Sequence, residues 1–236
     1  TSTNSSHNRF IVSGSEDNTI KLWKIPTKIH KPEEILNLMT TWSEHAHDKT
    51  IHCIKISPNN KFIVSTSSDK LSKLWSKKGN LLATLSGHKR SVNCACFSPV
   101  DKLLATGSSD FTIRLWSLTD FSCIKTLEES DSSIGSLFFL KNGFQLVSGY
   151  SCGAIKVWSI PENAILLTLE GHEDKVWTMS QSQDSNDFAS GDSSGRIVLW
   201  KVLSFHSFRI QQKKLRVNCA WKKWNSKKKS NFFLTI

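Results

Sequence analysis

The sequence lacks the features that mark several large classes of protein. It has no apolar run of membrane-spanning length and no signal peptide, so we expect no membrane partner. Its six cysteines include no C-x-x-C pair and no metal-ligand spacing, which supports neither a zinc site nor a disulfide framework. No glycine-rich phosphate-binding loop and no useful helical stripe of apolar residues is present. We therefore expect no metal, no cofactor, no small-molecule substrate and reduced thiols.

Acidic residues are missing from the C-terminal end. Residues 201–236 contain ten Lys or Arg residues and no Asp or Glu, so this segment carries +10 of the formal net charge of +11. Basic runs there alternate with aromatic residues that can stack on bases, which favours RNA binding. The RNA-binding candidates are Lys213, Lys214, Arg216, Lys222 and Lys223. Because short basic runs are common, the alternative is that residues 203–236 form a disordered or non-native tail.

Five tryptophans each close a short β-like segment that alternates apolar and basic residues. They are Trp23, Trp75, Trp116, Trp158 and Trp200, separated by 52, 41, 42 and 42 residues. A period near 40 residues that ends in such a strand is typical of a propeller built from four-stranded blades. The sequence therefore predicts an all-β fold of about five repeats over residues 8–202. Within the longer first interval, Lys31 to Met39 is predicted to be an insertion with room for a helical turn.

Histidine, hydroxyl and aspartate side chains recur in register with these tryptophans. A buried carboxylate needs a donor, an imidazole can supply one, and an indole N–H needs an acceptor, so each complete repeat should contain one hydrogen-bonded set. The predicted sets are His47/Ser65/Asp69/Trp75, His88/Thr106/Asp110/Trp116 and, without an aspartate, His172/Ser190/Trp200. Ser194 stands at the missing aspartate position, while Ser130 and Cys152 replace His and Asp in the fourth repeat, so these two repeats should be held less tightly.

The same His, Ser and Asp residues could be interpreted as a nucleophilic triad. A triad occurs once in an active site, whereas this set recurs at a fixed period on a strand framework. We therefore expect a structural role for the set and no enzyme activity.

These residues resemble the WD-repeat family, in which His, Ser/Thr, Asp and Trp link three strands and a turn in each blade. The resemblance covers roughly Asn8 to Val202 and implies a β-propeller. Members usually have about seven blades. Since the first repeat opens directly on the segment Phe10 to Gly14, its inner strand is expected to be missing, and the chain is expected to form part of a larger ring.

Three stretches narrow the resemblance further. They are Ala46 to Trp75, Phe97 to Glu128 and Leu169 to Trp177, and they are similar to the second propeller of the transducin-beta-like WD-repeat subunits of the small-subunit processome. The resemblance implies a non-enzymatic scaffold of the nucleus and nucleolus that acts in precursor ribosomal RNA processing. Its partners are then other protein subunits of a pre-ribosomal particle, with RNA contacted indirectly or through the basic tail.

Partner-binding residues are expected where each inner strand begins. The residue after the first apolar position should point to the central opening. This position holds His52, Asn93, Gly135 and Trp177, and the partner-binding candidates are His52, Asn93 and Trp177, together with Lys175 beside Trp177. Trp177 is the large aromatic residue of this set and the first hot-spot candidate, with ordinary packing as the alternative. A different function also stays open. The chain could be a substrate receptor, such as an adaptor of a ubiquitin ligase, that binds a short peptide on this face.

Overall fold

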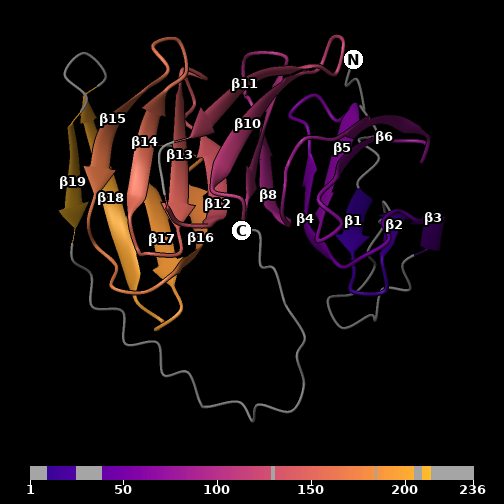
Figure 1. The fold of residues 1–236 in the computed structure, drawn as a ribbon, viewed down its shortest axis with the longest axis horizontal. Coiled ribbons are helices and arrows are strands. Elements are labelled where there is room, and N and C mark those ends of the chain that lie inside the picture. Colours follow the sequence, from indigo (N-terminus) through magenta and orange to yellow (C-terminus); the bar gives the residue numbers. More distant parts are fainter. Residues whose placement is uncertain (1–9, 25–38, 129–130, 184, 205–208, 214–236) are drawn as a thin grey trace, which may run out of the picture. The chain divides into compact units, whose positions relative to one another are not determined.

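The described part of the chain consists of β-strands. The computed structural model describes residues 10–24, 39–128, 131–183, 185–204 and 209–213. Over these residues it contains nineteen strands and no helix, arranged in five antiparallel sheets (Figure 1). The predicted all-β repeats are confirmed. No helix in this part of the chain is both long and apolar enough to cross a membrane.

Three sheets form the first of two compact units, which ends at Glu128. The first sheet has three strands, β1 (Phe10–Gly14), β2 (Thr19–Lys24) and β3 (Met39–His45). The second contains β4 (Ile51–Ile56), β5 (Phe62–Ser67), β6 (Ser72–Ser76) and β7 (Leu81–Leu85). The third contains β8 (Val92–Phe97), β9 (Leu103–Ser108), β10 (Thr112–Ser117) and β11 (Cys123–Glu128). The expectation that the first sheet lacks an inner strand stays a prediction, because residues 1–9 lie outside the described part.

Two four-stranded sheets form the second unit. The first contains β12 (Ile134–Phe139), β13 (Gln145–Tyr150), β14 (Ile155–Ser159) and β15 (Ala164–Leu169). The other contains β16 (Val176–Gln181), β17 (Phe188–Asp192), β18 (Ile197–Ser204) and β19 (Arg209–Lys213). Strand β19 pairs with β18 and places Gln212 opposite Trp200. The repeats therefore extend beyond residue 202, where the sequence predicted their end. Of the expected insertion, Met39 begins β3, and residues 31–38 lie outside the described part.

The core lies between successive sheets within each unit. In the first unit, Trp116 of the third sheet packs with Val64 and Leu74 of the second. In the second unit, Trp200 packs with Val147 and Val157 in the same way. Alternation along each strand explains this pattern, because neighbouring residues point to opposite faces and both faces are apolar. Within the units, Trp75, Trp116 and Trp200 thus each pack their own sheet against the preceding one.

A turn with a left-handed residue connects the second and third strands of every repeat. The residue five positions before each tryptophan has positive φ, at Asn18, Lys70, Phe111, Gly153 and Gly195. Such turns suit a tight antiparallel connection. At Gly153 there is a second constraint, because an added Cβ would lie 2.3 Å from the carbonyl oxygen of His172. At Gly195 an added Cβ would meet nothing within 4 Å.

These two glycines form a matched pair for mutation. We expect Gly195→Ala to lower the free energy of unfolding by about 1 kcal/mol, since only the left-handed backbone opposes a side chain. Gly153→Ala should cost at least about 2 kcal/mol more, because its Cβ also overlaps backbone. Urea denaturation of both variants tests this. Equal losses would contradict the close approach of the His172 carbonyl.

Candidate functional site

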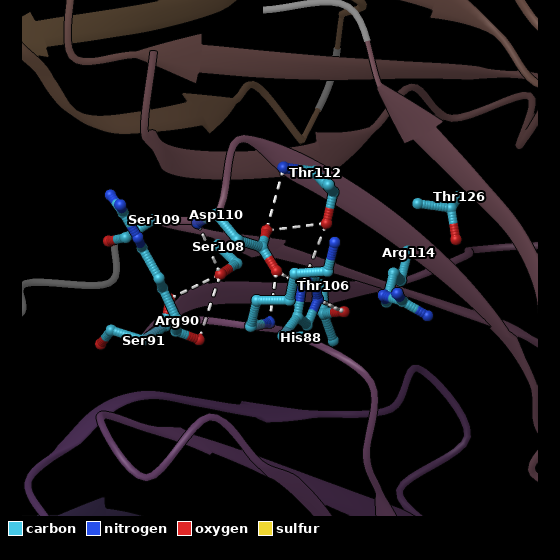
Figure 2. Close-up of polar contacts among 12 residues, drawn as sticks. His88, Arg90, Ser91, Thr106, Ser108, Ser109, Asp110, Thr112, Arg114 and Thr126 are labelled. Carbon is cyan, nitrogen blue, oxygen red and sulfur yellow. Dashed lines mark hydrogen bonds and ion pairs between the residues drawn. The ribbon is translucent and has the colours of Figure 1, made fainter. Parts of the chain in front are cut away.

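A buried polar set links the strands of the third sheet (Figure 2). His88 precedes β8, Thr106 lies on β9, Asp110 lies in the following turn, and Trp116 lies on β10. The His88 Nδ1 is 3.0 Å from Asp110 Oδ2, and its Nε2 is 2.8 Å from Thr106 Oγ1. The Trp116 indole N–H donates to the same Thr106 oxygen at 2.8 Å. One chain of hydrogen bonds therefore fixes two strands, a turn and the loop that enters the sheet.

The network assigns a neutral imidazole. Thr106 Oγ1 accepts from Trp116, so its own hydrogen is best directed at His88 Nε2, and Nδ1–H donates to Asp110. Burial lowers the pKa of His88, against the opposing effect of Asp110. Burial acts to raise the pKa of Asp110, but hydrogen bonds, first from the Thr112 hydroxyl and then from the Lys89 amide, outweigh it and lower that pKa to about 2. A charged carboxylate beside a neutral ring is the stable arrangement.

The second sheet contains the same set. His47 Nδ1 lies 2.8 Å from Asp69 Oδ2, and His47 Nε2 lies 2.8 Å from Ser65 Oγ. The Trp75 indole N–H donates to Ser65 Oγ at 2.9 Å. Burial lowers the pKa of His47, as in the third sheet. The two repeats for which the sequence supplies all four residues therefore share one geometry.

The last sheet also has a complete set, which corrects the prediction that Ser194 leaves it without a carboxylate. His172 Nδ1 lies 2.6 Å from Asp192 Oδ2, and its Nε2 lies 2.6 Å from Ser190 Oγ, which accepts from Trp200 at 2.8 Å. Asp192 ends β17 two residues before the expected position, and Ser194 donates to it at 2.6 Å. Aspartate and serine have exchanged places. The sequence signal was this exchange, Asp-Ser-Ser in place of Ser-Ser-Asp.

The fourth repeat has a different arrangement. Trp158 still donates to Ser148, at 2.9 Å, but the Ser148 hydroxyl lies 3.2 Å from the Tyr150 hydroxyl and 3.2 Å from the Lys156 carbonyl. Tyr150 is fully buried, with 1% of its surface exposed. Its phenol lies beside the hydroxyl that takes an imidazole in the neighbouring repeats. Cys152 is exposed, and Ser130 lies outside the described residues.

The hydroxyls in these sets are inaccessible to a substrate. Ser65 and Thr106 are 0% exposed and Ser190 is 1% exposed, and each accepts a tryptophan N–H. A nucleophile needs an open path and a free oxygen lone pair aimed at the reacting carbon. The geometry therefore supports a structural role. Over the described residues there is also no group of three His, Cys, Asp or Glu side chains placed to hold a metal ion.

Three of the residues proposed for partner binding lie at an irregularity near the start of their inner strands. A register shift falls between Ile51 and Cys53, between Val92 and Cys94, and between Val176 and Thr178. The extra residue is His52, Asn93 or Trp177. Such bulges redirect a side chain out of the regular alternation.

These redirected side chains have different surroundings. His52 Nε2 lies 2.6 Å from Ser68 Oγ, and the Asn93 amide donates to Ser109 Oγ at 3.0 Å. Trp177 instead remains 57% exposed, and the Lys175 ammonium lies 3.5 Å from the centre of its ring. Burial lowers the pKa of Lys175. Trp177 is therefore the accessible aromatic residue of this row, with a cation held against one face.

The RNA-binding candidates are the least defined part of the prediction. The backbone of Lys213 ends β19, and its side chain is not described. Lys214, Arg216, Lys222 and Lys223 lie outside the described residues.

Comparison with known proteins identifies the repeat. The model of the "WD domain, G-beta repeat" matches residues 2–24, 37–76, 79–117, 121–159 and 163–201. Transducin beta-like protein 3 of Bos taurus is 42% identical over 85 residues, which is 33% of this chain and 10% of that protein. U3 small nucleolar RNA-associated protein 13 of Saccharomyces cerevisiae is 35% identical over 78 residues, again 33% and 10%.

Another matched protein carries a different name. Nuclear distribution protein PAC1 of Candida tropicalis is 37% identical over 79 residues, which is 30% of this chain and 16% of that protein. The matched segment spans about a tenth of the length of the first relatives. Each of these three relatives therefore resembles this chain over a local segment.

The exchange of Asp192 and Ser194 can be tested by reversing it. Asp192→Ser should lower the free energy of unfolding by about 3 kcal/mol, because a buried hydrogen-bonded imidazole loses its carboxylate partner. Adding Ser194→Asp restores the order found in the second and third sheets. We expect the double variant to lie within about 1 kcal/mol of the parent chain. Urea denaturation measures the free energy of unfolding of both variants. A double variant that is no more stable than Asp192→Ser would refute the equivalence of the two residue orders.

The pKa shifts predict how stability depends on pH. His47 and His88 have folded pKa values below the ordinary 6.5, so the unfolded state binds more protons once the pH falls below that value. Asp110 titrates at about 2 instead of 3.8, so a further loss follows between these two values. The free energy of unfolding should therefore be nearly constant between about pH 7 and pH 8 and fall in two stages on acidification. A constant value between pH 7 and pH 5 would contradict neutral buried histidines.

Proposed function

Because this chain belongs to the WD-repeat family, we propose that it is a non-enzymatic scaffold of nucleolar ribosome assembly, acting where precursor ribosomal RNA is processed. The observation that carries the proposal is its likeness to a protein named for association with U3 small nucleolar RNA, at 35% identity over 78 residues. Transducin beta-like protein 3 is similar over a comparable share of the chain. The partners proposed are protein subunits of the same particle, with RNA contacted indirectly or by the basic tail.

The geometry suits a binding scaffold. The polar residues that recur most regularly are buried, and internal hydrogen bonds satisfy their donors and acceptors. Contacts with a partner therefore fall to residues at the strand ends. Among these, Trp177 is large, rigid and 57% exposed. Aromatic side chains in such positions dominate binding energy at many interfaces. We therefore propose Trp177 and Lys175 as the centre of a protein contact, with His52 and Asn93 at equivalent positions of their own sheets.

A peptide receptor is the second candidate function. The exposed indole of Trp177, with the ammonium of Lys175 against it, would hold an apolar side chain next to a carboxylate of a short peptide. Such a receptor should recover a narrow set of proteins that share a motif. A scaffold should instead recover many subunits of one particle together with its RNA.

Affinity purification of the tagged chain from nuclear extract, with identification of bound proteins and RNA, separates these functions. We expect pre-ribosomal subunits and precursor ribosomal RNA. Trp177→Ala should reduce their recovery at least about tenfold. Phe144→Ala is a matched control, because Phe144 is also 57% exposed. It follows the C-terminal end of β12, whereas Trp177 lies at the N-terminal end of β16. Equal recovery from both variants would remove Trp177 from the interface, and ligase components or a single peptide motif would favour the receptor.

A further inference from the structure

Exposed basic side chains gather on the loops beside the buried histidines of the second and third sheets. They are Lys49, Lys70, Lys89 and Arg90. In the part of the chain that the structure describes, none of the four forms an ion pair with a carboxylate. Together with Phe111, which lies in the turn after β9, they form what we call the basic loop face.

Hydrogen bonds hold the loops of this face next to one another. The Ser68 amide donates to the Thr50 carbonyl at 3.0 Å, and the Ser91 hydroxyl donates to the Ser68 hydroxyl at 3.4 Å. The Ser109 amide in turn donates to the Ser91 carbonyl at 2.9 Å. Both sheets belong to the first unit. The loops that carry the basic residues therefore form one continuous surface.

The positive charge of this face is not a general property of the repeat. Asp69 and Asp110 turn inward to the imidazoles, and their side chains are only 7% and 5% exposed, which leaves Asp48 as the exposed carboxylate of these loops. The equivalent loops of the second unit carry three acidic residues and one lysine, namely Asp131, Glu173, Asp174 and Lys175. The equivalent turn of the first sheet carries Glu16 and Asp17. The basic surplus is thus local, and it suits a polyanion.

Phe111 adds an aromatic side chain to this face at a conformational cost. It takes the left-handed position of its turn, with a φ of 73°, where the second unit has Gly153 and Gly195. A bulky residue is disfavoured there, so its presence points to a role of the ring itself. The ring is partly exposed, and the Arg90 guanidinium lies 5.7 Å from its centre. Figure 2 shows the Arg90 side chain extending away from His88, outside the buried set.

We propose that the basic loop face binds single-stranded RNA, with phosphates on the four basic side chains and a base stacked on Phe111. A basic track beside an aromatic ring holds single strands without base pairing, because every base offers an aromatic face. Arg90 can bond a phosphate while the adjacent ring holds the neighbouring base. An acidic peptide would use the cations but would gain nothing from the ring.

This inference deepens the proposed function, which leaves RNA contact indirect or to the basic tail. The choice of RNA as the strand rests on that function. The test uses purified components, so its failure would leave the recovery of pre-ribosomal subunits from nuclear extract unaffected.

Fluorescence anisotropy of a labelled oligouridine of about 12 nucleotides, titrated with the full chain, measures the affinity. The face variant combines Lys49→Ala, Lys70→Asn, Lys89→Ala and Arg90→Ala. It should bind at least about tenfold more weakly, and its affinity should depend less steeply on salt. The matched control removes four exposed charges outside these loops, by Lys61→Ala, Lys78→Ala, Lys102→Ala and Lys201→Ala. It should stay within about threefold of the parent chain. Both variants keep the basic tail, so the tail affects them equally.

Phe111→Asn separates base stacking from folding. Asparagine tolerates the left-handed conformation, as Asn18 shows at the same position in the first sheet, so the thermal unfolding temperature should stay close to that of the parent chain. Loss of the ring should still weaken RNA binding about tenfold. The salt dependence should not change, because no phosphate contact is lost.

Three results would overturn the proposal. Equal affinities of the face variant and its control would remove the basic side chains from the RNA contact. An unchanged affinity of Phe111→Asn would remove the ring. Tighter binding of a labelled glutamate-rich peptide than of oligouridine would assign the face to an acidic protein instead.

Discussion

The structure depends on the hydrogen bond from a tryptophan indole to a hydroxyl ten residues earlier. Among the described residues this side-chain bond recurs in all five repeats, at 2.9 Å for Trp23, Trp75 and Trp158 and at 2.8 Å for Trp116 and Trp200. Because the two residues lie on adjacent strands, the bond sets their register. Within the units, the rings of Trp75, Trp116 and Trp200 also pack against the preceding sheet. The imidazole and carboxylate are added to this pair and tie in the turn and the loop.

This arrangement separates stability from recognition. The polar residues with the strongest sequence signal are the ones least able to meet a partner, since their donors and acceptors are satisfied internally. Binding falls to residues at strand ends, where bulges turn His52, Asn93 and Trp177 away from the regular alternation. The first sheet is the exception. There Ser13 is exposed and Trp23 is half-buried, whereas Ser65 and Thr106 of the complete sets are fully buried.

The strands and most of the polar sets could be predicted because each depends on a short, fixed spacing. The exceptions have physical reasons. Asp192 was not predicted, because this aspartate stands two residues earlier than in the complete repeats. Its carboxylate still reaches His172, and Ser194 occupies the usual aspartate position in the turn. Tyr150 was missed because a phenol can stand beside Ser148 without any change in strand pattern. Strand β19 was not predicted. An outer strand needs apolar residues on one face only, and the basic, polar sequence of β19 shows no clear apolar alternation. Exposure of Trp177 could not be predicted, because spacing does not show what covers a side chain.

The most direct test of the scaffold account is sedimentation of the tagged chain in nuclear extract through a density gradient. The account predicts that a substantial fraction migrates with large particles that contain precursor ribosomal RNA, and that ribonuclease treatment shifts it to lighter fractions. Migration of all the chain as free protein, or with complexes free of that RNA, would contradict it.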